Sequence, residues 1–375
     1  MTGSLSMIFI DITVVGVALP QIRADLGMSD AGLNWVMSVY TLVMACLVAF
    51  CGRIADMIGR VPAFILGVVV FALASLACGF AGSEGSLIAG RACQGVGAAL
   101  MQPASGALVI SAFARRHRGK VMAIYVGIPL LFMVIGPLVG GFLTQAASWR
   151  WCFWVNLPVA AAALILTAIA RPLDARSASW RIDPWSLLLL MIGLPALILA
   201  VQQGNEWGWM APWSTTLAER IPPARLVTSL PLAAAGAVLL VLFIRRQWRS
   251  SEPLLALGLF RDRGLLANAL ILFMMQFTMT GLLLQGSVYA QEVLGFDPRQ
   301  AGASLLPLLV PILFVVHVAG RLYDRIGVRA PAIIGTALAT AGGLIAGIGA
   351  WLKNYPIIGC GFAIMGVGIG FVMSP

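Results

Sequence analysis

Long apolar stretches, separated by short polar segments, run through the whole chain. Each stretch has the roughly twenty residues that an α-helix needs to cross a hydrocarbon core of about 30 Å. Transmembrane β-strands are about half as long and alternate apolar with polar residues, so the pattern indicates helices. We predict twelve spans, at residues 3–19, 33–51, 62–81, 86–112, 121–144, 152–170, 184–202, 227–244, 264–290, 301–319, 330–351 and 355–374.

Composition agrees with an all-α polytopic membrane protein. Apolar residues make up 60% of the 375 positions and charged residues 10%, which leaves too little polar surface for a soluble fold. The net charge of +10 does not predict nucleic-acid binding, because the basic residues are scattered between apolar stretches. The six cysteines show no CxxC string and no spacing with histidine that suits a metal. We therefore expect no metal and no cofactor.

Basic residues are distributed unevenly between alternate loops. Seventeen lysines and arginines fall in one set of loops and six in the other, while Arg91 lies inside a predicted span. The positive-inside rule makes the first set cytoplasmic and places the N-terminus in the cytoplasm. We expect a multi-pass protein of the bacterial cytoplasmic (inner) membrane.

An internal repeat divides the chain. The string that begins at Gly52 recurs 268 residues later at Gly320, and both copies fall in short predicted cytoplasmic loops. The string from Gly95 to Gly97 likewise returns from Gly366 to Gly368. Two homologous halves are the simplest explanation. We predict a conformational role for the loop positions Gly52, Asp56, Gly59, Arg60, Gly320, Asp324 and Gly327.

The spacing of the repeat predicts how the spans are grouped. Eight spans separate equivalent points, although six would suffice for two adjoining halves, so two extra helices lie between them. We predict an N-terminal six-helix bundle at 1–170, two linker helices with their loops at 171–263, and a partial C-terminal bundle of about four helices at 264–375. On this interpretation a complete protein has fourteen spans, and the C-terminal end lacks two of them.

Few ionisable residues fall within the predicted spans. A charge at the centre of a membrane helix costs at least about 2.5–3.5 kcal/mol, so Asp11 and Arg91 are functional candidates for proton coupling, together with Gln94. The alternatives are a permanently paired structural carboxylate at Asp11 and a structural arginine at position 91. Residues 91, 94, 98 and 102 share one helix face, which we expect to line a wet cavity.

Small residues in two spans predict close helix packing. Gly90 and Gly97 lie on a different face of the fourth span, where a neighbouring helix can approach. In the fifth span, proline bends the helix and glycines leave a surface without side chains. The residues concerned form a GPxxGG string at Gly136, Pro137, Gly140 and Gly141.

Carboxylates in the repeated loops suggest a conformational switch. We expect Asp56 and Asp324 to stand at the start of the third and eleventh spans, where a helix N-terminus and neighbouring arginines attract a carboxylate. A pair that forms in one state and breaks in the other biases alternating access without touching substrate.

Several strings together resemble a known family, the fourteen-span drug:proton antiporters (EmrB/QacA type) of the major facilitator superfamily. The resemblance runs along the whole chain. It rests on an LDxTxVNVALP-like string at 10–20, GxxxDxxGR at 52–60, RxxQGxGAA at 91–99, GPxxGG at 136–141 and WRWxFxxNxP at 149–158.

The resemblance implies a major facilitator fold with two pseudo-symmetric helix bundles. It also implies a role for Arg91 in proton coupling and for Gly136 and Pro137 in export direction. Gly16 replaces the family's usual asparagine and Ile10 its usual leucine. The tenth span lacks an acidic residue, which argues against a strict exporter of divalent cations.

The function we expect is transport by a proton-coupled antiporter that exports drugs or other small, mostly lipophilic molecules by alternating access. Its partners are the small-molecule substrate, protons and the lipid bilayer, with a periplasmic adaptor as an optional addition to a monomer. A dedicated exporter of a natural product or metabolite, and an inactive truncated fragment, remain alternatives. A passive channel needs a ring of polar groups, and an enzyme needs a clustered catalytic set; the sequence predicts neither.

Overall fold

A computed structural model describes residues 2–113, 118–170, 183–202, 204, 229–250, 257–326 and 329–372. Within these residues, twelve helices are long and apolar enough to cross a membrane, judged by length and composition. They coincide with the twelve predicted stretches, which confirms an all-helical polytopic fold. The predicted division into three segments stays a prediction.

Seven helices build the first part of the chain. Several extend beyond the predicted spans, because a helix can continue outside its apolar segment. The first helix runs through Pro20 to Leu26, and the second includes Asp56. The helices are α1 (Thr2–Leu26), α2 (Asp30–Ile58), α3 (Arg60–Gly79), α4 (Glu84–Ala112), α5 (Arg118–Ala146), α6 (Trp151–Trp154) and α7 (Asn156–Ala170).

The sixth predicted span is divided between the short helix α6 and α7, and one of the remaining predicted spans is interrupted in the same way. The predicted tenth span consists of a short helix and a long one separated at Leu305, whereas a continuous helix was predicted. The elements are α8 (Pro184–Gln202), α11 (Ser229–Arg249), the short 3-10 helix η3 (Leu257–Arg261), α12 (Arg263–Glu292), α13 (Pro298–Ser304), α14 (Leu306–Ile326), α15 (Arg329–Trp351) and α16 (Tyr355–Val372).

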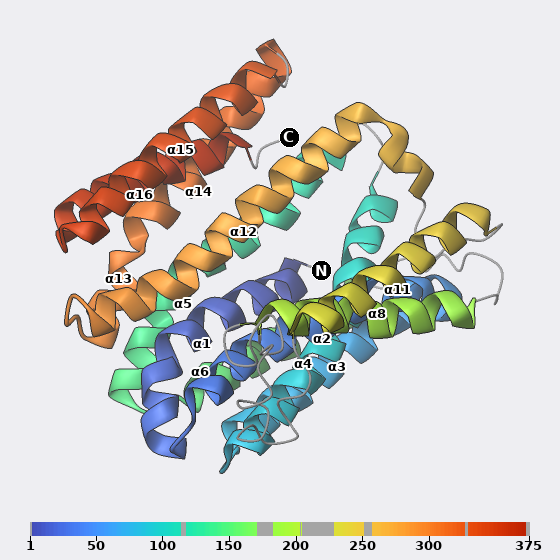
Figure 1. Ribbon diagram of the computed structural model, residues 1–375, viewed down its shortest axis with the longest axis horizontal. Coiled ribbons are helices and arrows are strands. Elements are labelled where there is room, and N and C mark those ends of the chain that lie inside the picture. Colours follow the sequence, from blue (N-terminus) through green and yellow to red (C-terminus); the bar gives the residue numbers. More distant parts are fainter. Residues whose placement is uncertain are drawn as a thin grey trace, which may run out of the picture.

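The helices form groups that follow the chain order (Figure 1). Within the first group, α4 packs against both α2 and α3, and α1 packs against α5. In the last group, α16 packs against α14 and α15, drawn in orange and red. Between these groups in sequence, α8 packs along α11 and contacts α2. The long helix α12 contacts α1, α13 and α16.

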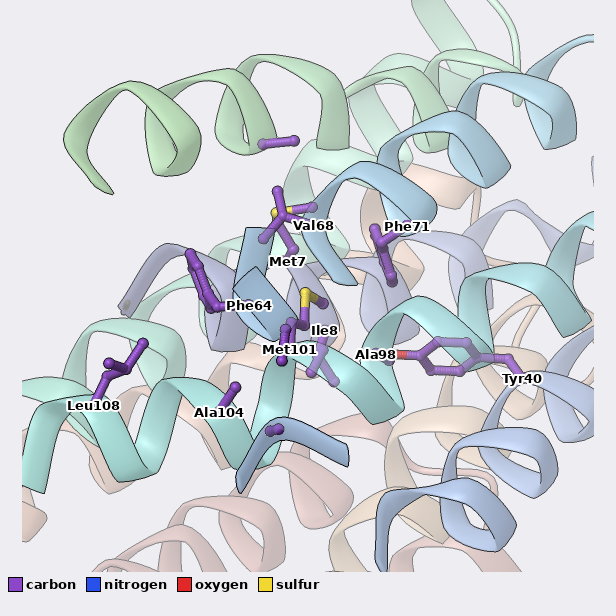
Figure 2. Packing of buried hydrophobic residues seen from close by; sticks show 13 residues of the cluster. Met7, Ile8, Tyr40, Phe64, Val68, Phe71, Ala98, Met101, Ala104 and Leu108 are labelled. Carbon is purple, nitrogen blue, oxygen red and sulfur yellow. The ribbon is translucent and has the colours of Figure 1, made fainter. Parts of the chain in front are cut away.

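Figure 2 shows the apolar core where α3 meets α4. Phe64, Val68 and Phe71 of α3 pack with Met101 and other buried side chains of α4. Glycine allows this contact to be close, since a Cβ placed on Gly67 would lie 2.6 Å from the Met101 backbone nitrogen. The shared surface is therefore closely packed, and burial of its apolar side chains within the helix group fixes the position of α4.

Two glycines of the repeat hold α4 close to its neighbours. A Cβ on Gly95 would lie 2.7 Å from the Tyr40 carbonyl oxygen of α2, and one on Gly97 would lie 2.6 Å from the Phe71 nitrogen of α3. Real Cβ atoms do not approach backbone so closely. The predicted close approach at Gly97 is confirmed.

The second copy of the string makes the same pair of contacts. Gly366 of α16 faces the Leu308 carbonyl of α14, and Gly368 faces the Ala339 backbone nitrogen of α15, in both cases too closely for a side chain. In each copy, the first glycine thus packs on one helix and the last on the next. The repeat in the sequence therefore corresponds to a repeat in helix packing.

The two helices between the repeated groups form a closely packed pair. Gly193 of α8 crosses Gly236 of α11, where a Cβ on Gly236 would lie 2.9 Å from the Gly193 carbonyl oxygen. Beside the start of α8, the Asp183 carboxylate accepts hydrogen bonds from the Nε and Nη2 of Arg246 in α11, the second at 2.9 Å. The glycine crossing and the ion pair hold α8 and α11 together.

Candidate functional site

An ion pair lies inside the first helix group. Arg91 of α4 donates through Nη1 to the Asp11 carboxylate of α1, and both side chains are 0% exposed. Residues of α2, α6 and α7 also surround the pair, so neither side chain reaches the surface. Removing two charges from water costs several kcal/mol per ion, and mutual attraction offsets that cost only when further hydrogen bonds are made.

Neutral side chains supply those further hydrogen bonds. Gln94 of α4 accepts from Arg91 Nη1 at 2.9 Å and donates to the second Asp11 oxygen at 3.1 Å. Asn156, at the start of α7, donates to that same oxygen at 3.1 Å. The hydroxyl of Ser75 in α3 accepts from Gln94 Nε2 at 2.7 Å. The carboxylate is therefore held by side chains from α4 and α7, with α3 supporting them.

The guanidinium of Arg91 makes contacts on its other side as well. Its Nε donates to the Val36 carbonyl oxygen of α2 at 2.9 Å. The carbon of the guanidinium lies 4.5 Å from the ring centroid of Tyr40 and 5.9 Å from that of Phe153, within range of cation-π attraction. These contacts bring α2 and α6 into the cluster. The side chain is therefore fixed in direction.

Three polar atoms in this cluster have no hydrogen-bond partner among the described residues. They are the Tyr40 hydroxyl, Arg91 Nη2 and the Asn156 side-chain oxygen, and all are buried. A buried polar group without a partner costs about 1–3 kcal/mol, so such groups are uncommon in a site with a purely structural purpose. These atoms can donate or accept additional hydrogen bonds when the charge of the cluster changes.

The structure brings together the three residues predicted for proton coupling, but not in the predicted setting. Arg91, Gln94 and Ala98 are fully buried, whereas Gln102 is half-buried, so the part of this helix face around the ion pair does not line a wet cavity. The reason is the ion pair, which turns Arg91 towards α1. A cavity of about 360 Å³ lies elsewhere, among residues of α1, α2, α8 and α12.

The loop motif between α2 and α3 forms a partly exposed ion pair. Asp56 lies in the last turn of α2, not at the start of the third span as predicted, because α2 continues to Ile58. Arg60, the first residue of α3, approaches its carboxylate to 3.3 Å. Gly59 between the helices has a φ of 108°, a conformation that favours glycine. Gly52 packs against Pro103, where an added Cβ would make an ordinary contact at 3.6 Å.

The second copy of the loop motif lies mostly outside the described part of the chain. Gly320 and Asp324 fall within the backbone of α14, but their side chains are outside the described set. Gly327 is also outside the described residues. Their conformational role stays a prediction.

The GPxxGG string of α5 packs against α1. A Cβ on Gly140 would lie 2.8 Å from the Val14 carbonyl oxygen, and one on Gly136 would overlap the Thr13 hydroxyl. Thr13 and Val14 are only a few residues after Asp11 on α1. The predicted close-packing surface is therefore confirmed, and it lies less than one helical turn along α1 from Asp11.

The same string also packs against α13, in the second part of the chain. A Cβ on Gly141 would lie 2.7 Å from the Pro298 carbonyl oxygen. Gly302 of α13 faces the Pro137 carbonyl, again too closely for a side chain. The string therefore forms a backbone-to-backbone contact between the first helix group and the helices that follow residue 263.

The string WRWxFxxNxP contains residues that bind carboxylates of α1 and that sequence reasoning did not single out. Asn156 binds the Asp11 carboxylate, as described above. At the other end of α1, Asp25 accepts from Trp149 Nε1 at 2.9 Å and from Arg150 Nη1 at 2.7 Å. The string itself was the available signal. It ties α6 and α7 to both ends of α1.

Comparison with known proteins gives a consistent result. The Major Facilitator Superfamily matches residues 1–375. A multidrug resistance protein B homolog of Mycobacterium tuberculosis is 34% identical over 98% of this chain and 66% of its own length. A puromycin resistance protein of Streptomyces alboniger is 36% identical over 90% of this chain and 64% of its own length. The chain thus spans just under two thirds of these relatives.

Solved structures agree on the fold. A peptide transporter crystallised with sulfate superposes with a TM-score of 0.64 at 14% identity, covering 98% of this chain and 79% of that protein. The xylose transporter of E. coli, in a partially occluded inward open conformation, gives a TM-score of 0.61 at 14% identity, covering 100% of this chain and 83% of that protein. At such identities the likeness concerns the fold alone.

Proposed function

Because this multi-pass membrane protein belongs to the major facilitator superfamily, we propose that it is a proton-coupled antiporter that exports drugs or other small, mostly lipophilic molecules. The names of its relatives support the substrate class, since several are multidrug resistance proteins. The strings along the chain favour the fourteen-span branch of the family. We further propose that the protein lies in the bacterial cytoplasmic membrane with its N-terminus in the cytoplasm, as the basic residues of the loops indicate.

The observation that carries proton coupling is the buried ion pair. A proton that binds Asp11 neutralises the carboxylate and leaves the Arg91 guanidinium buried without its counter-charge. A buried unpaired charge is costly, so the protonated protein favours an arrangement in which Arg91 finds another partner or water. Protonation and helix rearrangement are coupled in this way, because each changes the free energy of the other.

The surroundings of the pair support this assignment. Gln94 and Asn156 donate to the carboxylate and carry no charge, so they keep Asp11 in place without competing for a proton. The α5 string that packs beside Asp11 also contacts α13. A change at the ion pair therefore has a short structural route, through α1 and α5, to the second part of the chain.

The test uses export from proteoliposomes with and without an imposed pH gradient, and tetraphenylphosphonium as the probe. We expect the full chain to export this cation faster when the gradient is present. Asp11→Asn keeps the shape of the side chain and removes its ability to ionise. We expect this variant to lose the response to the gradient.

Asp25→Asn is the matched control. Asp25 is an aspartate of the same helix and is also ion-paired, at 2.7 Å with Arg150, but it is partly exposed. We expect this variant to keep gradient-driven export. Undiminished gradient-driven export by Asp11→Asn would remove Asp11 from the mechanism and end the proposal of coupling through this pair.

A further inference from the structure

The cavity of about 360 Å³ lies where four helices meet. Most of its wall comes from α2, through Asn34, Met37, Ser38 and Thr41. The other described lining residues come one each from α1, α12 and α8, namely Ile12, Thr280 and Gln202. Its volume falls in the range of about 300–1,000 Å³ that is usual for small-molecule sites.

The contribution of α8 is unexpected, because α8 belongs to the two helices predicted to lie between the repeated halves. Gln202, its last residue, donates through Nε2 to the Ser38 hydroxyl at 2.7 Å. Ser38 in turn donates to the Asn34 carbonyl oxygen of its own helix at 2.6 Å. The amide of Gln202 is thereby held against the wall that α2 forms.

Contacts with α11 and α2 fix the position of α8. The crossing of Gly193 with Gly236 and the ion pair between Asp183 and Arg246 join α8 to α11. The hydrogen bond from Gln202 to Ser38 then anchors the far end of α8 to α2. The two linker helices, α8 and α11 (the linker pair), are thus attached to the first helix group at the cavity, where the side chain of Gln202 can contact a bound ligand.

The lining has a distinct chemical character. Five of the side chains carry a hydroxyl or an amide, two are apolar, and none of the described residues that line the cavity is charged. Hydroxyls and amides both donate and accept hydrogen bonds. A ligand with hydroxyl or amide groups and an apolar portion can use both parts of this surface, whereas a cation finds no carboxylate among the described lining residues.

We infer that this cavity binds uncharged amphiphilic molecules that carry hydroxyl or amide groups, and that Gln202 of the linker helix determines specificity for them. This inference rests on the proposed export function and assigns a ligand class and a new residue to it. The linker pair then supplies part of the binding surface, in addition to joining the two halves. Gln202 and Ser38 distinguish ligands by hydrogen bonding, which rejects molecules that lack a matching group.

The test measures binding to the purified full chain by isothermal titration calorimetry. Chloramphenicol is the probe, because it is uncharged and combines two hydroxyls, an amide and an aromatic ring. Gln202→Leu removes the amide at nearly constant size. We expect it to raise the Kd for chloramphenicol about five- to tenfold, the effect of one lost hydrogen bond or slightly more.

The matched control is Gln291→Leu. Gln291 lies on α12 outside the cavity lining, and its amide bonds within its own helix to Ser287. We expect its Kd for chloramphenicol to stay within twofold of the parent. Binding of tetraphenylphosphonium, which has no hydrogen-bonding group, should be unchanged in both variants. Equal melting temperatures of the two variants establish that Gln202→Leu is folded.

Three results would overturn the inference: no binding of chloramphenicol by the parent protein, unchanged binding by Gln202→Leu, or equal weakening by both variants. Gradient-driven export of tetraphenylphosphonium separates this inference from the proposed function. If that export persists while the binding results fail, the cavity assignment alone is wrong. If the parent shows no gradient-driven export, the proposed antiport is wrong whatever the calorimetry shows.

Discussion

Asp11 and Arg91 lie 80 positions apart in the sequence, and their side chains form an ion pair that is fully shielded from the surface. Neutral partners satisfy much of the pair, but Arg91 Nη2 has no partner among the described residues. The neutral partners therefore stabilise the ion pair, while Nη2 of Arg91 can still donate to a new acceptor when the charge of the pair changes. Its energetics can be measured separately from transport.

We predict that breaking this pair destabilises the fold more than removing it. Asp11→Asn or Arg91→Gln alone leaves one buried charge unpaired, which costs about 3–5 kcal/mol. The double variant leaves no buried charge, so its loss of stability should be clearly smaller than the sum of the two single losses. Thermal unfolding of all four proteins in detergent measures this coupling. Additive losses would show that the two charges do not interact in the folded protein.

We predict that Gly140→Ala disturbs the contact of α5 with α1. Its Cβ would lie 2.8 Å from the Val14 carbonyl oxygen, so the helices must separate, at about 1–3 kcal/mol. Gly127→Ala is the control in the same helix, because no described residue lies within 4 Å of the added Cβ. Alanine favours helix over glycine, so this control should unfold at the same or a slightly higher temperature. Equal effects of the two substitutions would contradict the packing described here.

We predict that the ion pair of Asp56 with Arg60 affects transport more than stability. Both side chains are partly exposed, at 39% and 24%, and such pairs contribute about 0–1 kcal/mol. Asp56→Asn should therefore change the melting temperature little while it slows export, because the pair is proposed to favour one conformation. The exchanged variant with Arg at 56 and Asp at 60 should recover part of the rate. A large loss of stability without any change in export rate would argue for a structural role instead.

We predict a small pH dependence from Asp183, which lies just before α8. Hydrogen bonds from Arg246 hold the pKa of Asp183 below its ordinary value of 3.8. Because the pKa of Asp183 is lower in the folded protein than in the unfolded chain, its ion pair with Arg246 stabilises the fold fully above pH 3.8. This stabilisation is lost as the pH falls through the pKa of the folded protein. Asp183→Asn should melt slightly below the parent at neutral pH, and the difference should vanish towards strongly acidic pH. A difference that stays constant with pH would exclude this ion pair as its cause.

The sequence was sufficient to predict the helices but not their ends. Twenty-residue apolar stretches identify spans because the bilayer sets their length. Their ends depend on backbone hydrogen bonds, which continue outside the apolar segment, as in α2 through Asp56. The first predicted span ended at residue 19, just before Pro20, yet α1 continues through that proline to Leu26. The interruption at Leu305 comes two residues before Pro307, whose missing backbone N–H was a signal that the prediction of a continuous span did not take into account.

The candidate site was predictable in part for a related reason. A charge inside a membrane helix is rare and costly, which singles out Asp11 and Arg91 from composition and spacing alone. Their pairing depends on how α1 and α4 are rotated about their axes, which hydropathy does not determine. The same limit applies to Asn156, which is a neutral residue at the start of a helix. Only the folded arrangement shows that it binds Asp11.

The contact of Pro137 in α5 with Gly302 in α13 has a mechanical consequence. No side chain stands between the two backbones at this point, so the helices have no interlocking surface there and can tilt across each other at little cost. Pulling them apart would instead lose close contact along both chains. The crossing would therefore act as a pivot, because a tilt of one helix against the other would keep the separation at this point and move the remote ends of the helices.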